Sequence, residues 1–440
     1  MSRILFGAGS CTENVSLSRR NVLRGAGASL ALWSFMPRAA IAGTRDPRLL
    51  TIILRGGMDG VSLVSPTGDP DYTRLRSSTA MPIAGERAGL ALDGFFTLNP
   101  NMPFLHGLYQ KREALLAHAV HTPYRERSHF DGQDVLESGL AGVSRGVDGW
   151  LNRALRGLPA QGKASPKGLA MGAVVPLVMR GEAAVLSWIP KVYNLPLRDS
   201  TVARLMELYQ HTDPVLAKAF AEGMEINRVA EAGMAAAAMP AMKPQTVAAT
   251  PGAPAIQAVA TATPVPPKPF REFTEAAEAA ARFMSAADGP RVGALSYNGW
   301  DTHANEGVVQ GQLAGRLAGL DAAIETLHNG LGAAWKDTVI VVVTEFGRTA
   351  RENGTNGTDH GMATCALFLG GAVKGGRVHA DWPGLADKDL FQNRDLKPTT
   401  DLRVMLKGLL RDHLGIPDGA LGQTVFPGTA QLKGMDGLLA

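Results

Sequence analysis

The stretch Leu49-Leu50-Thr51-Ile52-Ile53-Leu54, followed directly by Arg55-Gly56-Gly57-Met58-Asp59-Gly60, decides the fold class. Its first six residues form a short, almost wholly apolar run, which is typical of a strand buried on both faces of a parallel sheet. The glycine-rich segment predicts a loop at the carboxyl end of that strand, where open α/β sheets bind their ligands. The sequence therefore predicts an α/β protein with Asp59 at the ligand edge of its sheet.

Segments further along the chain alternate between strand and helix patterns. Residues 338–344 form a Val/Ile-rich run of the same buried kind as the first strand. This alternation predicts a mostly parallel sheet covered by helices. The other expected strands are residues 115–120, 291–297 and 364–369, and the expected helices are residues 105–116, 130–140, 270–287, 313–331 and 401–414.

The first 42 residues are interpreted as a twin-arginine export signal. Arg19 and Arg20 lie in Ser18-Arg19-Arg20-Asn21-Val22-Leu23, an apolar stretch follows at residues 26–36, and Ala40-Ile41-Ala42 fits an A-x-A cleavage site. The alternative is an uncleaved anchoring helix, but the apolar stretch is shorter than the roughly 20 residues that a membrane span requires. We therefore expect export by the twin-arginine machinery, a periplasmic or secreted mature protein, and no stable membrane span after cleavage.

The net charge argues against nucleic-acid binding, and the cysteine content argues against a disulfide within the mature chain. The chain has a formal net charge of +4, and residues 1–42, with five arginines and one glutamate, account for all of it. The remaining chain is formally neutral, which argues against nucleic-acid binding. Removal of the signal would also remove Cys11 and leave Cys365, so no disulfide is expected within the chain.

The composition changes at residues 232–268, where alanine, proline, methionine and threonine dominate. Such a segment has too few bulky apolar residues to form a core. We therefore expect one domain over residues 43–440, interrupted by an exposed insertion at about 232–268. The insertion could be a lid over a substrate site or an arm that docks a protein partner.

Metal-ligating residue types gather in the C-terminal third of the chain. Gly299-Trp300-Asp301-Thr302-His303 and Gly357-Thr358-Asp359-His360-Gly361 lie on either side of the run that ends in Thr344-Glu345-Phe346-Gly347-Arg348. Carboxylates and imidazoles bind Zn²⁺ and similar ions, and the carboxyl ends of parallel strands meet at one edge. We predict a divalent-metal site, most simply for Zn²⁺ with Mn²⁺ or Ca²⁺ as alternatives. The predicted ligands are Asp59, Asp301, His303, Glu345, Asp359 and His360.

Several of these residues have a structural alternative. Asp59 could form a turn with Gly60, and Glu345 could cap a helix that follows its strand. Ser128 could cap the helix expected from residue 130, and Arg348 could pair with Glu345. The sequence leaves these alternatives open.

Four segments carry a resemblance to a known family. Arg55 to Gly60, Ser128-His129-Phe130-Asp131, Gly-Trp-Asp-Thr-His and Thr-Glu-Phe-Gly-Arg resemble the exported family called domain of unknown function 1501, over about residues 49–430. Their order is also similar to the alkaline phosphatase and sulfatase superfamily. That resemblance implies a three-layer α/β/α sandwich that binds one or two metal ions and hydrolyses phosphate or sulfate esters.

The same resemblance suggests catalytic roles. In the superfamily a serine, threonine or modified cysteine at a helix start is the nucleophile; Ser128 matches it, and Ser62 matches less well. His129 could be a ligand or a proton donor, and Arg348 or Arg127 would stabilise anionic charge. Phe346 stands where the superfamily usually has histidine, so a second ion would lose a ligand.

Two functions follow from these assignments. The first is a periplasmic metal-dependent hydrolase of a small anionic ester, with Ser128, His129 and Arg348 as catalytic residues. The alternative is a non-catalytic metal- or anion-binding component of an exported protein complex.

Overall fold

The computed structural model describes residues 45–158 except 145 and 147, residues 168–189 except 173, residues 199–213, a few positions between 217 and 224, and residues 268–440. Asp46–Ala440 is one compact unit. The expected signal at residues 1–42 lies outside the described residues, as does the expected insertion except for Lys268. In the described part, no helix combines the length and the apolar character that crossing a membrane requires.

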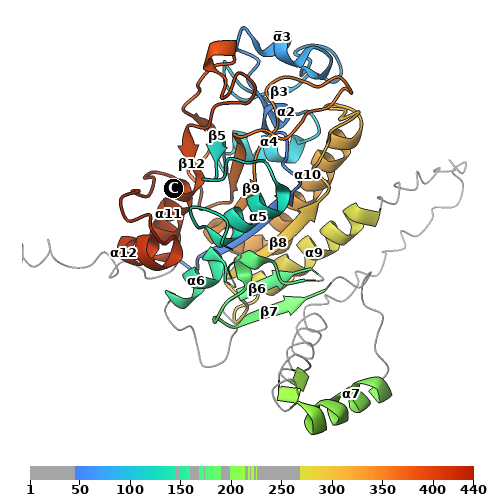
Figure 1. Cartoon of the computed structure of the whole chain (residues 1–440), viewed down its shortest axis with the longest axis vertical. Helices are drawn as coiled ribbons and strands as arrows, with labels where there is room; N and C mark the ends of the chain where they lie inside the picture. Colours follow the sequence, from blue (N-terminus) through green and yellow to red (C-terminus); the bar gives the residue numbers. More distant parts are fainter. Residues whose placement is uncertain are drawn as a thin grey trace, which may run out of the picture. The chain divides into compact units, whose positions relative to one another are not determined.

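A nine-stranded sheet lies at the centre of the unit (Figure 1). Its order is β11-β5-β10-β9-β1-β8-β6-β7, and the short β12 pairs with β5. All strand pairs in this sheet are parallel except those of β10, which runs antiparallel to β9 and β5. The strands are β1 (Arg48–Arg55), β5 (Ala114–His121), β6 (Gly168–Met171), β7 (Val185–Trp188), β8 (Val292–Asn298), β9 (Thr338–Thr344), β10 (Thr364–Leu369), β11 (Arg377–Ala380) and β12 (Thr400–Asp401).

Helices cover both faces of this sheet. Alternate residues of β1 point to opposite faces and pack in two different hydrophobic cores. Leu50 and Ile52 pack in a cluster with residues of α4 (Pro103–Gln110), α9 (Lys268–Ser285) and α10 (Gln312–Leu331). Leu49 and Ile53 pack in a second cluster on the opposite face. The expected three-layer, mostly parallel α/β fold is thereby confirmed. The helices of the second face are α5 (His129–Ser138), α6 (Trp150–Arg156) and α11 (Leu402–Leu414).

Smaller elements complete the described part. The short helices are α2 (Gly60–Leu63), α3 (Tyr72–Arg76) and α12 (Asp418–Ala420), and a longer helix is α7 (Asp199–Thr212). A separate antiparallel sheet has the order β2-β4-β3, with β2 at Val64–Ser65, β3 at Leu90–Ala91 and β4 at Thr97–Leu98.

The expected elements agree with the structure except at one helix boundary. Several short strands of the central sheet were not expected. The helix expected at residues 105–116 ends at Gln110, since Arg112 has φ +64° and Leu115 and Leu116 belong to the buried strand β5. The sequence analysis did not predict β6, β7, β11 or β12. These strands have two to four residues, too few to show a periodicity.

The carboxyl ends of β1, β5, β8 and β9 lie at one edge of the sheet, because these strands are parallel. Leu54 is in register with Tyr297 of β8 and with Thr344 of β9. The antiparallel β10 begins at the same edge, since Thr364 is in register with Val120. The loops that carry the predicted site therefore converge at this edge.

Candidate metal centre

Three histidine rings direct their Nε2 atoms toward Asp301, just beyond the carboxyl end of β8. Asp301 Oδ1 lies 3.0 Å from His303 Nε2 and 3.1 Å from His360 Nε2, and these two Nε2 atoms are 2.9 Å apart. His129 Nε2 lies 3.4 Å from Asp301 Oδ2, is shielded from solvent and has no hydrogen-bond partner among the described residues. Ligand atoms of His129, Asp301 and His360 all lie within 4.8 Å of one another, an arrangement that could hold a metal ion.

The Nδ1 atom of each of the three rings faces a hydrogen-bond acceptor. An acceptor at Nδ1 places the ring proton there and leaves the lone pair of a neutral ring on Nε2, as in most metal-binding histidines. The site therefore offers three imidazole lone pairs and one carboxylate. The acceptors are Asp359 Oδ1 for His303 at 3.0 Å, the Arg127 carbonyl oxygen for His360 at 2.9 Å, and Glu345 Oε1 for His129 at 2.8 Å.

This arrangement fits a divalent cation. Two lone pairs and a carboxylate oxygen about 3 Å apart repel one another unless a cation lies between them. Burial is the largest influence on the pKa of His360 and lowers it. In a tetrahedral Zn²⁺ site with bonds of about 2.0–2.1 Å, neighbouring ligand atoms are about 3.3 Å apart. The separations of 2.9–3.1 Å among Asp301 Oδ1, His303 Nε2 and His360 Nε2 are slightly shorter than this distance.

Helix α5 and strand β9 together position the ring of His129. His129 is the first residue of α5, and one turn later Gln133 Nε2 donates to Glu345 Oε1 at 3.1 Å. Glu345 follows β9 directly, is fully buried and also accepts from the amide of Gly56 at 2.9 Å. Burial would raise the pKa of Glu345, but the hydrogen bond from His129 and the other donors outweigh it and lower the pKa. The same hydrogen bond raises the pKa of His129.

Two loops dock closely on each other to place His303 beside His360. A Cβ atom at Gly357 would lie 2.4 Å from the His303 carbonyl oxygen, so glycine is required for this approach. Asn353 Nδ2 donates to that same carbonyl at 2.8 Å and to Asp359 Oδ1 at 3.1 Å. Burial would raise the pKa of Asp359, but the hydrogen bonds from His303 and Asn353 outweigh it and lower the pKa.

Arg348 holds the loops of the site together instead of facing a substrate. Its side chain is fully buried, and Nε and Nη2 donate to the carbonyl oxygens of Gly57 and Gly56, both at 2.6 Å. Nη1 donates to the Thr358 carbonyl at 3.1 Å, and Nη2 also donates to Asp301 Oδ1 at 2.5 Å. Burial would raise the pKa of Asp301, but Arg348 outweighs it and lowers the pKa. The carboxylate partner of Arg348 is Asp301, whereas the sequence analysis had offered Glu345, and its other contacts hold the surrounding loops.

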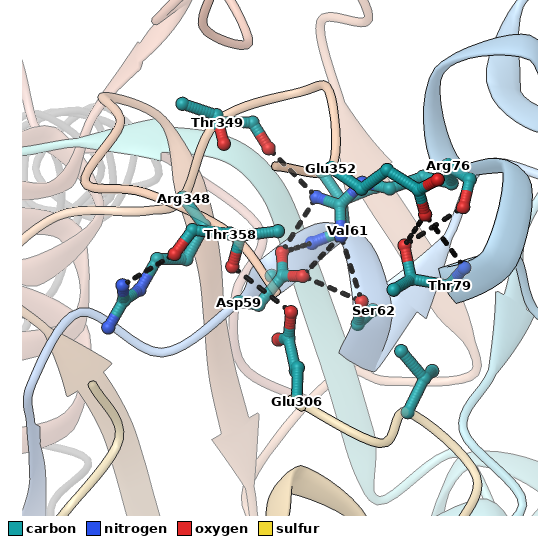
Figure 2. A network of polar contacts seen from close by, with 12 residues as sticks. Asp59, Val61, Ser62, Arg76, Thr79, Glu306, Arg348, Thr349, Glu352 and Thr358 are labelled. Atoms are coloured by element: carbon teal, nitrogen blue, oxygen red, sulfur yellow. Dashed lines mark hydrogen bonds and ion pairs between the residues drawn. The ribbon is translucent and has the colours of Figure 1, made fainter. Parts of the chain in front are cut away.

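Asp59 lies in a separate buried network, shown in Figure 2. Ser62 Oγ donates to Asp59 Oδ2 at 2.6 Å, and the amide of Val61 donates to Oδ1 at 3.1 Å, which caps the start of α2. Arg76 contacts both carboxylate oxygens, with Nη2 at 3.0 Å from Oδ1. Burial would raise the pKa of Asp59, but Arg76 outweighs it and lowers the pKa. The structure therefore does not bring Asp59 to the histidines, because its oxygens are already engaged.

Glu306 belongs to the same network and was not singled out from the sequence. In Figure 2 its carboxylate is directed toward Asp59 and Thr358. Oε2 accepts from Thr358 Oγ1 at 3.1 Å, whereas Oε1 has no hydrogen-bond partner among the described residues. Burial, and then the charge of Asp59, raise the pKa of Glu306 to about 8. The sequence signal that could have identified Glu306 is its position three residues after His303.

Ser128 occupies the cap position of α5 without capping it. Its amide donates to the hydroxyl of Tyr124 at 3.1 Å, and its side chain makes no capping hydrogen bond. Ser128 directly precedes His129, the first residue of α5. Phe346 is buried and stacks on His129 with ring centroids 4.9 Å apart, so an apolar ring stands where the superfamily pattern places histidine.

The predicted site residues thus fall into three groups. Asp301, His303 and His360 lie together, and His129, which the sequence analysis had placed among the catalytic residues with ligation as an alternative, lies beside Asp301. Glu345 and Asp359 accept hydrogen bonds from the rings of His129 and His303. Asp59 and Arg348 stabilise the loops around the site.

Fold and site together define an α/β protein with a histidine- and aspartate-rich candidate metal centre at the carboxyl edge of its central sheet. The family model described as "Protein of unknown function (DUF1501)" matches residues 110–425, well over half of the chain. The chain belongs to this family, as the motifs in the sequence indicate. The match includes all of the histidine centre and begins after the segment that contains Asp59.

Comparison with solved structures gives matches at low identity. Ps i-CgsB in complex with k-i-k-neocarrahexaose is 10% identical with a TM-score of 0.41, covering 89% of this chain and 75% of that chain. The phosphonate monoester hydrolase of Agrobacterium radiobacter is 12% identical with a TM-score of 0.30, covering 78% of this chain and 74% of that chain. No curated protein matches the chain by sequence. The function is therefore inferred from the geometry of the site.

Proposed function

We propose that this protein is a metal-dependent hydrolase of phosphate or sulfate esters, with one Zn²⁺ ion held by His129, Asp301, His303 and His360. The convergence of three anchored Nε2 atoms on Asp301 supports this proposal best. Imidazole and carboxylate donors suit Zn²⁺, and Mn²⁺ is the main alternative. Ca²⁺ prefers oxygen ligands and fits this set less well.

The chain supplies the reaction with an accessible centre and a candidate nucleophile. A bound divalent ion would polarise an anionic ester and acidify the attacking hydroxyl or water. The side chains of Asp301 and His303 are 42% and 44% exposed, so an ester can reach them from solvent. Ser128 lies at the start of α5, where the positive end of the helix dipole favours an anionic group. We propose the Ser128 hydroxyl as the nucleophile.

The alternative is a non-catalytic metal-binding component of an exported complex. One observation favours it, because four protein donors would fill the tetrahedral shell that structural zinc sites have. The arginines expected to stabilise anionic charge, Arg127 and Arg348, both donate to protein acceptors. The exposure of Asp301 and His303 supports the hydrolase, since an ester could reach the ion from solvent. Export to the periplasm through the predicted signal at residues 1–42 is part of both proposals.

Metal content tests the proposal directly. Wild-type protein purified from the periplasm should contain one zinc per chain by elemental mass spectrometry, and His303→Ala and His360→Ala should contain less than a tenth of that. His106→Ala is the matched control, because this ring contacts the Ala91 carbonyl and the Gln110 amide instead. Wild type should hydrolyse 4-nitrophenyl phosphate or 4-nitrophenyl sulfate. Bound metal without hydrolysis of either ester would support the binding role. Folded wild type without metal would exclude the metal-dependent hydrolase and leave the anion-binding form of the alternative.

A further inference from the structure

Arg127 has a backbone conformation that its residue type disfavours. Its φ is +65°, in the left-handed region where a side chain crowds its own carbonyl oxygen. Such a conformation persists only where surrounding contacts hold it. The contacts that hold Arg127 in this conformation therefore indicate its structural role.

The side chain of Arg127 is held by Asp395, which is fully buried. Nε and Nη2 of Arg127 lie 3.0 Å and 2.5 Å from Asp395 Oδ2, and Nη2 also donates to Gln392 Oε1 at 2.7 Å. The backbone of Asp395 is fixed in turn, because it forms antiparallel bridges with Thr349 and Phe391. Asp395 is thus a rigid anchor for the guanidinium.

The backbone of Arg127 reaches the candidate metal centre. Its carbonyl oxygen lies 2.9 Å from His360 Nδ1, and Ser128 and His129 follow it at the start of α5. One segment connects Asp395 to His360. Arg348 forms a backbone β-bridge with His360, and the next residue, Thr349, forms a backbone β-bridge with Asp395. The same segment therefore supports His360 and the residue that anchors Arg127.

We propose that Asp395 is a positioning residue that acts through Arg127 on His360. The ion pair keeps Arg127 left-handed, which directs its carbonyl at His360 Nδ1. That carbonyl keeps the proton of the neutral ring on Nδ1 and the lone pair on Nε2, facing Asp301. The effect on metal affinity rests on the proposed function, whereas the effect on the tautomer does not.

The first readout is the tautomer of His360 in metal-free protein, measured from ¹⁵N shifts of the imidazole ring at a pH where the ring is neutral. Wild type should carry the proton on Nδ1. Asp395→Ala should give a mixture of both tautomers, because the carbonyl of Arg127 is no longer held in place. Arg394→Ala is the matched control, since Arg394 Nη1 lies 3.5 Å from Asp395 Oδ1, and it should leave the tautomer unchanged.

The second readout is Zn²⁺ affinity, measured by competition with a chelating dye. Loss of such a supporting contact typically weakens metal binding 10- to 100-fold, and we expect a loss in this range for Asp395→Ala. The double variant Arg127→Gly/Asp395→Asn should recover the Nδ1 tautomer and most of the affinity. Glycine adopts the left-handed conformation without strain, and asparagine leaves no buried charge unpaired. A merely stabilising ion pair would not be rescued at His360 in this way.

The outcomes of these measurements test the positioning role of Asp395 and, separately, the proposed function. A wild-type tautomer in folded Asp395→Ala would overturn the proposal, and so would a double variant that folds but stays mixed. If Asp395→Ala does not fold, Asp395→Asn takes its place with the same expected direction. If wild type binds no Zn²⁺, the proposed function fails, and the tautomer measurement still tests the positioning role.

Discussion

The Nε2 atoms of His303 and His360 lie 2.9 Å apart, while Nδ1 of each ring faces an acceptor. In their neutral forms neither ring can then donate to the other, so a cation between the two nitrogens would stabilise the pair. Metal binding should therefore be coupled to stability.

We predict that chelation lowers the melting temperature and that added Zn²⁺ restores it. An ion at 100 times its dissociation constant stabilises the folded state by about 2.7 kcal/mol. Differential scanning calorimetry with and without chelator measures the shift. His360→Ala should show less than a quarter of it, whereas an equal shift in both proteins would place the ion elsewhere.

Gly357→Ala should reduce Zn²⁺ content at least tenfold. The added Cβ would lie 2.4 Å from the His303 carbonyl oxygen and push apart the two loops that carry the ligands. Gly354→Ala in the same loop is the control, because a Cβ there meets nothing within 4 Å. Elemental analysis of both variants checks the prediction, and full metal content in Gly357→Ala would contradict it.

Asp59→Asn should destabilise the protein while zinc content stays at the wild-type level. Removing one partner of a buried ion pair costs roughly 3–5 kcal/mol, and both Asp59 and Arg76 are fully buried. Asp71→Asn removes the more exposed pair with Arg74 and should change stability much less, because solvent screens exposed ion pairs. Urea unfolding and elemental analysis provide the two readouts. Loss of metal from folded Asp59→Asn would return this residue to the ligand set.

The stability difference between wild type and Glu306→Gln should depend on pH. Burial raises the pKa of Glu306 from 4.5 to about 8, so the folded state binds this proton more tightly than the unfolded state. This stabilising contribution is complete below pH 4.5 and disappears as the pH rises through 8. Wild type should thus lose stability relative to Glu306→Gln by a few kcal/mol between pH 5 and pH 9. Urea unfolding at several pH values measures it, and parallel curves would refute the raised pKa.

Ser128→Ala should lower kcat for ester hydrolysis at least about 10³-fold and leave zinc content unchanged, because a nucleophile acts only in the chemical step. Ser62→Ala is the control, since Ser62 Oγ donates to Asp59 in the separate buried network. Steady-state kinetics with elemental analysis distinguishes the two serines. Wild-type turnover in Ser128→Ala would indicate direct attack by water.

Much of the fold and the place of the site were predictable from the sequence. Long apolar runs such as residues 338–344 identify buried strands, and the residues that follow them must lie at one sheet edge when the strands are parallel. Asp301, His303 and His360 are therefore found together as expected. Local residue pattern determines these features, because strand burial and strand ends depend on neighbouring residues in the chain.

Only the tertiary structure decided the role of each acid. Glu345 and Asp359 have ligand chemistry, yet they support His129 and His303, and His129 points its other nitrogen at Asp301. The oxygens of Asp59 are engaged by Arg76, a partner 17 residues away that no spacing rule indicates. Composition and order determine which groups reach the edge of the sheet. Side-chain direction and partners distant in sequence determine which of them face one another, because contacts between side chains depend on displacements of a few ångströms.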